Sequence, residues 1–147
     1  MLAGEGCVIC ANAALKSNEH SDLILESDTS YVHLSKNQTH TGYSLVMLKR
    51  HAPELHDLEP NELKGFWRDV AAVGRVITEL FAPVKLYTLT MGGKAPHVHC
   101  HVFPQYRDDD PHADPRINEG SVRLSEAEQR ARVAAMRGRL LTTGRAD

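Results

Sequence analysis

The stretch His97-Val98-His99-Cys100-His101-Val102-Phe103 is the most informative part of this sequence. Three histidines alternate with apolar residues, and a period of two is typical of a β-strand. Alternate side chains of a strand point to one face about 6.6 Å apart. The histidines therefore line one surface, and the residues between them enter a core. Because packing alone rarely selects three imidazoles, the pattern favours an active-site strand over exposed histidines or an accidental metal site.

Composition describes an ordinary globular chain. With 147 residues, the sequence is long enough for one domain with a real core. The formal net charge of −2 gives no global field that would gather nucleic acid or an anionic membrane. No apolar run approaches the roughly 18 residues of a membrane span, and no signal peptide is visible at the start. Three cysteines, two of them in Cys-x-x-Cys, suit a reducing compartment, so we expect a cytoplasmic protein.

Hydrophobic periodicity predicts an α+β domain with a mostly antiparallel sheet. Alternating or continuous apolar runs predict strands, and apolar residues at 3–4-residue spacing after Pro60 predict a helix of about 20 residues that Pro83 ends. Gly92-Gly93-Lys94-Ala95 is expected to be a tight connection that makes the last two strands a hairpin. The expected strands are 23–26, 31–34, 43–49, 84–91 and 97–103, and the expected helices are 60–81 and 125–141.

The long helix carries more apolar residues than one sheet needs. Phe66 and Trp67 fall on its apolar stripe, where a core or dimer-interface role is better supported than base stacking. We therefore expect a homodimer.

The pattern His-φ-His-φ-His-φ-φ, with φ apolar, resembles the histidine-triad (HIT) superfamily of nucleotide hydrolases and transferases. The likeness runs from Cys7-Val8-Ile9-Cys10 to about Pro115 and is similar to a bacterial zinc-bearing HIT hydrolase subgroup. It implies a HIT-like fold, a five-stranded antiparallel sheet with one long central helix, usually paired into a dimer. We expect a single domain over 1–147, with a core at about 5–115 and a C-terminal helical extension at about 123–141.

The resemblance also implies the chemistry. In the family the middle histidine, here His99, attacks the α-phosphorus and forms a nucleotidyl-histidine that water hydrolyses. His101 matches the third histidine, which supports the nucleophile. Backbone N–H groups around Gly93 and Lys94 are expected to hold phosphoryl oxygens. A catalytic zinc held by three histidines is the competing interpretation of the strand.

A second site is indicated by Cys7 and Cys10, whose spacing lets both thiolates bind one metal ion. In zinc-bearing HIT proteins the remaining ligands are a histidine after the third strand and the first triad histidine, which match His51 and His97 here. The resemblance thus implies a closed, structural zinc site. An unmetallated reduced pair and a redox Cys-x-x-Cys are the alternatives.

The sequence departs from the family pattern near the expected ribose and phosphate contacts. Ser35, with Asn37 close by, occupies the position of an acidic residue or Asn that holds the ribose hydroxyls. Tyr87 replaces a frequent Asn, and Gln105 replaces a frequent Arg. Ser cannot make the charged bidentate contact of a carboxylate.

The predicted function is a hydrolase or transferase that cleaves a nucleoside polyphosphate or phosphoramidate, diadenosine-polyphosphate-like, at its α-phosphorus. A nucleotide-binding regulatory HIT protein with little turnover is the alternative, and a small zinc interaction module is a third. The remaining histidines carry no spacing signal and are expected in ordinary surface or loop positions: His33, His40, His56 and His112.

Overall fold

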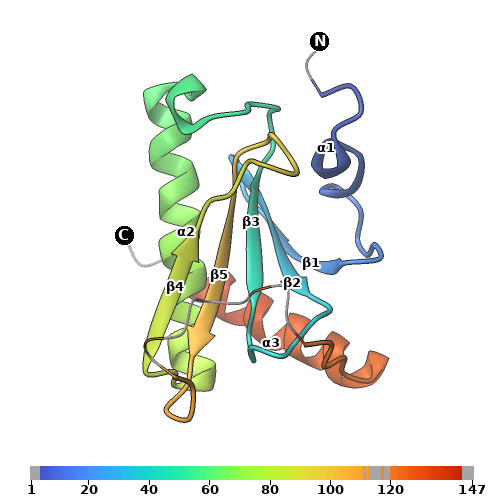
Figure 1. The fold of residues 1–147 in the computed structure, drawn as a ribbon, viewed down its shortest axis with the longest axis vertical. Helices are drawn as coiled ribbons and strands as arrows, with labels where there is room; N and C mark the ends of the chain where they lie inside the picture. The colour runs from blue at the N-terminus through green and yellow to red at the C-terminus, as the bar shows by residue number, and fades with distance from the viewer. Residues whose placement is uncertain (1–3, 111, 113–116, 118–119, 144–147) are drawn as a thin grey trace.

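Five strands form one antiparallel sheet in the order β1-β2-β3-β5-β4 (Figure 1). The computed structural model describes residues 4–110, 112, 117 and 120–143. The expected α+β class with an antiparallel five-stranded sheet is confirmed. The strands are β1 (Ser21–Glu26), β2 (Ser30–Ser35), β3 (Ser44–Leu48), β4 (Lys85–Leu89) and β5 (His99–Gln105), and the helices are α1 (Val8–Asn12), the 3-10 helix η1 (Leu55–Asp57), α2 (Pro60–Phe81) and α3 (Glu126–Thr143).

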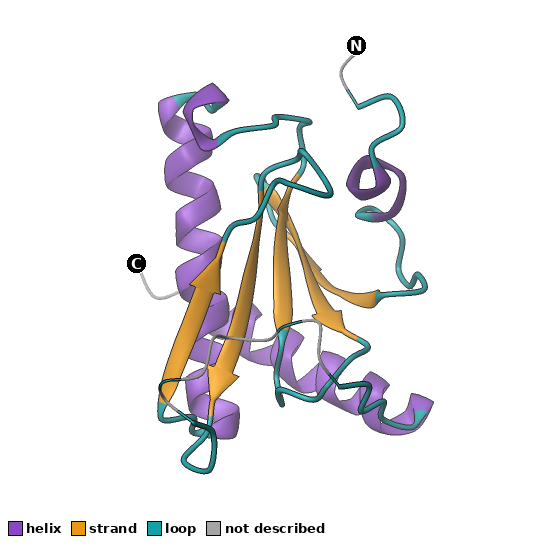
Figure 2. Ribbon diagram, in the orientation of Figure 1, coloured by secondary structure: helices purple, strands orange, loops and turns teal. Residues whose placement is uncertain are grey.

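The two long helices cover one face of the sheet (Figure 2). Helix α2 packs against β2, β3 and β5, and α3 packs against β1 and α2. Val98, Cys100 and Val102 enter the core beneath them, as the alternation predicted. Helix α3 adds Val133 and Met136 to that same core, so it is an integral part of the packing. None of the helices in the described part of the chain is long and apolar enough to cross a membrane.

Helix α2 begins and ends where the sequence predicted. Pro60 is its first residue, and Glu59 and Glu62 form a capping box there. At the other end Ala82 takes the left-handed conformation with φ 46°, which lets its N–H reach the Thr78 carbonyl. Phe66 is fully buried, whereas Trp67 on the same helix is 39% exposed.

The connection between β4 and β5 differs from the expected tight turn. Strand β4 ends at Leu89 and β5 begins at His99, so the connection spans residues 90–98. The N–H of Val98 donates to the Ala52 carbonyl, and its own carbonyl accepts from the Leu48 N–H. These bonds hold the chain beside the end of β3 before pairing with β4 starts. His97 therefore lies ahead of the strand rather than in it.

Two features near the N-terminus were not predicted. The first expected helix was 60–81, but Val8–Asn12 forms α1. His33, expected in a surface or loop role, is completely buried in β2. Its Nε2 donates to the Ala13 carbonyl at 2.7 Å, and its Nδ1 lies 2.9 Å from the Ser21 hydroxyl. The surface prediction for His33 was wrong because both ring nitrogens find partners that make burial favourable.

Candidate functional site

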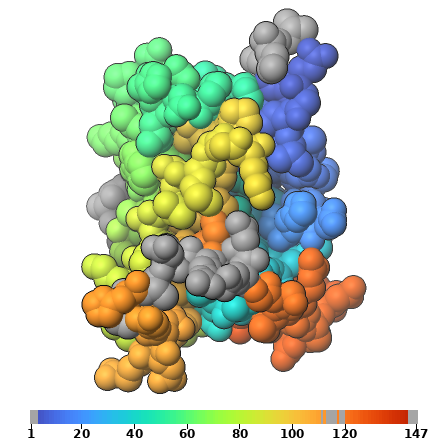
Figure 3. Space-filling model, viewed as in Figure 1, coloured from blue at the N-terminus to red at the C-terminus, as the bar shows by residue number. Residues whose placement is uncertain are grey.

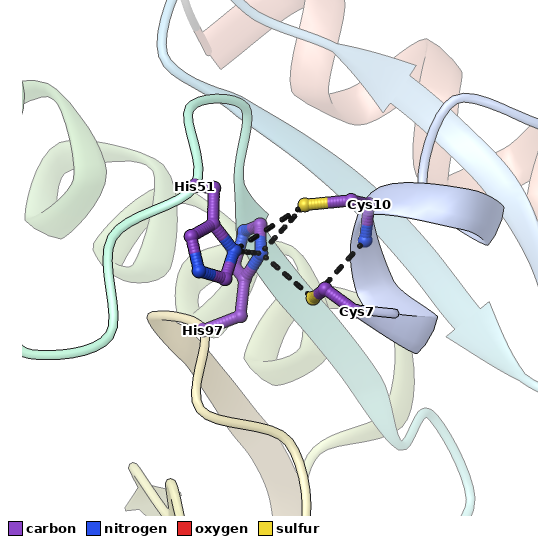
Figure 4. Close-up of side chains that lie close together, drawn as sticks. All are labelled: Cys7, Cys10, His51 and His97. Carbon is purple, nitrogen blue, oxygen red and sulfur yellow. Dashed lines mark hydrogen bonds between the residues drawn. The ribbon is translucent and has the colours of Figure 1, made fainter. Parts of the chain in front are cut away.

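Four potential metal ligands converge at one end of the sheet (Figure 4). Cys7 and Cys10 come from the start of α1, His51 from the loop after β3, and His97 from the residues just before β5. Their Sγ and Nδ1 atoms all lie within 4.8 Å of one another. The four residues named from the cysteine spacing and the family resemblance are thus close enough to bind one metal ion.

Distances within the cluster fit a tetrahedral zinc ion. With Zn–S of about 2.3 Å and Zn–N of about 2.0 Å, a tetrahedron separates S and N by about 3.5 Å and two N atoms by about 3.3 Å. Cys7 Sγ and Cys10 Sγ lie 3.4 and 3.3 Å from His97 Nδ1. His51 Nδ1 lies 3.4 Å from Cys10 Sγ and 3.3 Å from His97 Nδ1. The observed separations fit within a few tenths of an ångström.

The hydrogen bond of His97 and the pKa values of the cluster explain how its donor atoms can lie so close together. His97 Nε2 donates to the Leu48 carbonyl at 2.7 Å, which leaves the Nδ1 lone pair directed at the two sulfurs. Burial, together with the hydrogen bond and the charge of Cys7, raises the pKa of Cys10. Burial lowers the pKa of His97. A cation shared by the four side chains would offset the burial that disfavours the Cys10 thiolate, and the neutral His97 ring offers it a lone pair.

The ring of His99 is oriented by the backbone two residues earlier. Its Nδ1 donates to the His97 carbonyl at 2.6 Å, and the residue is only 7% exposed. Because Nδ1 carries the proton in this bond, Nε2 keeps its lone pair. An imidazole held in that tautomer presents a nucleophilic nitrogen at a fixed orientation.

His101 is held by a residue outside the triad. The Tyr43 hydroxyl lies 2.7 Å from His101 Nδ1. Burial raises the pKa of Tyr43 to about 12, and burial with the neighbouring His99 lowers the pKa of His101 to about 4. The His99 and His101 rings meet edge to face, with centroids 5.0 Å apart. Both imidazoles thus lie side by side on the face of the sheet opposite the core.

The serine and asparagine expected at the ribose have contacts within the chain. Ser35 is 5% exposed, and its hydroxyl accepts from the Asn37 backbone N–H at 3.1 Å. The Asn37 side chain donates to the Gly120 carbonyl and accepts from Thr39. Both residues lie at the end of β2, two strands away from β5.

The other expected contacts lie at opposite ends of β5. Gly93 and Lys94 are exposed in the connection before His97. Gln105 ends β5 opposite Lys85 and is 9% exposed. Six residues of strand, about 20 Å, separate it from His99. A substrate contacting both ends must therefore extend along the strand.

Tyr43 was not among the predicted site residues. It precedes β3 and packs against Phe103 with ring centroids 5.8 Å apart. A tyrosine at a strand end is ordinary in any sheet, so the sequence gives no local sign of this contact. Only the pairing of β3 with β5 brings it to His101.

Comparison with known proteins identifies the family to which this chain belongs. The HIT domain family profile matches residues 16–108. The chain belongs to the HIT domain family, whose members hydrolyse or bind nucleotides.

Two characterised relatives agree with this assignment. Protein hit of Bacillus subtilis (strain 168) is 26% identical over 115 residues, covering 75% of this chain and 78% of that protein. The asymmetrical bis(5'-nucleosyl)-tetraphosphatase of Schizosaccharomyces pombe is 33% identical over 73 residues. That match covers 46% of this chain and 40% of the yeast protein, so it spans less than half of either.

Solved structures support the fold. A histidine triad protein from Bradyrhizobium japonicum aligns with a TM-score of 0.73 at 20% identity, covering 83% of this chain and 92% of that one. A Zn-bound histidine triad family protein from Mycobacterium smegmatis aligns over 98% of this chain and 99% of its own, with a TM-score of 0.67 and 21% identity. This second alignment includes α1 and α3.

Proposed function

We propose that this protein is a nucleotide hydrolase that cleaves a nucleoside polyphosphate or phosphoramidate, diadenosine-polyphosphate-like, through covalent His99. The observation that carries the proposal is the bond from His99 Nδ1 to the His97 carbonyl. In the neutral ring this bond places the free lone pair on Nε2, and no charged partner is needed to select that tautomer. Membership of the HIT family and the partial match to a tetraphosphatase favour this chemistry.

The reaction proceeds in two displacements. His99 Nε2 attacks the α-phosphorus, the N–P bond forms, and the bond from phosphorus to the leaving group breaks. The leaving group departs with the electron pair of that bond and takes its proton from solvent, and the Nε2–H of the neutral His101 beside His99 donates a hydrogen bond to it. Water then attacks the nucleotidyl-histidine, and the N–P bond breaks to release a nucleoside monophosphate. Backbone N–H groups near Gly93 and Lys94 are the proposed contacts for phosphoryl oxygens.

Zinc is the proposed structural metal, held by Cys7, Cys10, His51 and His97. Four protein ligands leave no open position for water, so the ion supplies folding energy and rigidity rather than chemistry. One observation favours this assignment over a catalytic zinc held by the three triad histidines. His97 Nδ1 faces the two cysteines and its Nε2 donates to the Leu48 carbonyl, so neither nitrogen is directed at His99 and His101.

The test is product formation from diadenosine tetraphosphate and from an AMP phosphoramidate. Wild type is expected to release AMP from at least one, and His99→Ala is expected to release none while keeping its melting temperature. His56→Ala, which changes an exposed histidine in η1, is the matched control. An active His99→Ala variant contradicts the covalent mechanism.

A nucleotide-binding regulator is the second candidate, favoured by one observation. Ser35 and Asn37, the expected ribose contacts, are engaged in bonds within the chain. Without a carboxylate there, substrate orientation is weaker and turnover slower. Saturable AMP binding by calorimetry, combined with no turnover of either substrate, would support this function over the hydrolase.

We also propose a homodimer formed through α2 and the edge strand β4. Trp67, Val70 and Leu86 line a groove between these elements. Strand β4 has a partner on one side only, and such edges are commonly covered by a second chain or by charge.

A further inference from the structure

A cavity of about 900 Å³ lies at the edge of the sheet formed by β1, remote from the triad. The segment Lys16–Ser17 forms one wall, and the first half of α3 forms another. Figures 1 and 3 show these two segments bordering the same side of the molecule. Strands β2 and β3 separate β1 from β5. Three strand spacings, about 14 Å, therefore lie between this cavity and the catalytic strand.

The cavity has a charge opposite to that of the whole protein. Five basic and two acidic side chains line it, a formal charge of +3, whereas the entire chain carries −2. Such a local excess in a concave site attracts small anions. The basic residues are Lys16, Lys36, Arg123, Arg130 and Arg137, and the acidic ones are Asp22 and Glu126.

Three of the charged side chains, those of Asp22, Lys36 and Arg137, are already paired with other groups of the protein and are held in place. Asp22 accepts from the Ser17 hydroxyl at 2.5 Å and from Gln129 Nε2 at 3.0 Å, and Lys36 lies 3.8 Å from it. Arg137 donates to the carbonyls of β1 at Leu23 and Ile24. Asp22 is thus neutralised by the protein itself and does not repel an incoming anion.

The other three cations, Lys16, Arg123 and Arg130, are exposed to solvent. Lys16 and Arg123 line the cavity and are exposed. Arg130 pairs with Glu126 at 3.6 Å, one turn away on α3, but the two side chains are 74% and 93% exposed. An exposed pair of this kind is weak, so Arg130 is readily recruited by a ligand.

Gln129 is a fixed part of the cavity wall. The residue is 8% exposed, and its Nε2 donates to Asp22 and to the Ser35 carbonyl. These two bonds tie α3 to β1 and β2 at the cavity. Leu124 and Val133 add apolar surface to the wall.

We propose that this cavity is a second ligand site, which binds a small phosphorylated metabolite. The phosphate would lie among Lys16, Arg123 and Arg130, because these lining cations are exposed. The carbon skeleton would contact the apolar wall. The volume is in the range of small-molecule sites. The proposal is independent of the reaction at His99.

The test uses glycerol 3-phosphate as the probe and glycerol as its analogue without the phosphate. Titration is followed by ¹⁵N NMR of the wild-type protein, with the Gln129 side-chain amide as the reporter. Glycerol 3-phosphate is expected to bind and to shift that amide, and glycerol is expected to do neither. Reversing Lys16 and Arg123 together to Glu is expected to weaken binding at least about tenfold.

The matched control reverses two exposed cations of α2, Lys64→Glu with Arg68→Glu, and should leave the affinity unchanged. Equal loss of affinity in both double variants, or no shift of the Gln129 amide with glycerol 3-phosphate, would overturn the proposal.

Discussion

The hydroxyl of Tyr43 lies 2.7 Å from Nδ1 of His101, and this contact fixes the tautomer of the third triad histidine. With its pKa raised to about 12, the phenol keeps its proton at neutral pH. No other acceptor for that proton is present among the described residues, so Tyr43 donates and His101 Nδ1 accepts. The proton of His101 therefore resides on Nε2, the atom available to a leaving group.

Tyr43→Phe is expected to lower kcat by about 10–100-fold, because His101 then populates both tautomers. KM and the melting temperature should change little, since the ring still packs on Phe103. Steady-state kinetics with the better of the two substrates provides the measurement. Tyr106→Phe removes a phenol bonded to the Thr41 carbonyl and is the matched control. Equal kcat in the Tyr43 and Tyr106 variants would argue against tautomer control.

Cys7→Ser is expected to lose the bound metal and to lower the melting temperature, because a tetrahedral site with three ligands binds zinc far more weakly. Metal content by elemental analysis and calorimetric melting measure the two effects. Cys100→Ala provides the control, since Cys100 is buried in the core on the other face. Equal zinc content in wild type and Cys7→Ser would refute the assignment.

Stability should fall as the pH drops from about 6.5 toward 4. The pKa of His101 is lowered from 6.5 to about 4, so between these values the unfolded chain binds a proton that the folded protein does not. Stability from this group is complete above pH 6.5 and is lost as the pH falls, by up to about 3 kcal/mol. Urea unfolding at pH 7 and pH 5 measures the change.

His101→Asn provides the reference for that experiment, because it retains the other buried histidines and lacks this titration. The pH dependence of the variant should be shallower than that of wild type. An NMR titration midpoint of His101 near 6.5 in wild type would contradict the expectation.

Light scattering should give a mass of about twice 16.3 kDa. Trp67→Glu is expected to shift the mass toward the monomer, since a charge in an apolar interface is costly to desolvate. Leu141→Glu changes an apolar residue of α3 that is 53% exposed and serves as the control. A monomeric wild type, or a Trp67→Glu variant that remains dimeric, would rule out this interface.

Sequence reasoning found the parts of the site that depend on local spacing or on a family motif. The alternation through His99 and His101 predicted the strand, and Cys7 with Cys10 predicted a metal pair. His51 and His97 were reached only through the resemblance, because a ligand set drawn from three separate segments has no local pattern.

The sequence did not reveal the residues whose roles depend on contacts between distant segments. His33 is buried because Ala13 and Ser21 satisfy both nitrogens, and those contacts depend on how α1 folds back onto β1 and β2. The long connection before β5 escaped prediction for a related reason. Its path is set by bonds of Val98 to Leu48 and Ala52, about 50 residues away in the chain.

The ring and the carbonyl of His97 contact different residues. Its ring reaches Cys7, 90 residues earlier in the chain, while its carbonyl accepts from the ring of His99. A single residue thus mechanically connects the thiols to His99, the proposed nucleophile. Any event that releases the thiols, whether chelation or oxidation, would loosen the orientation of the His99 ring.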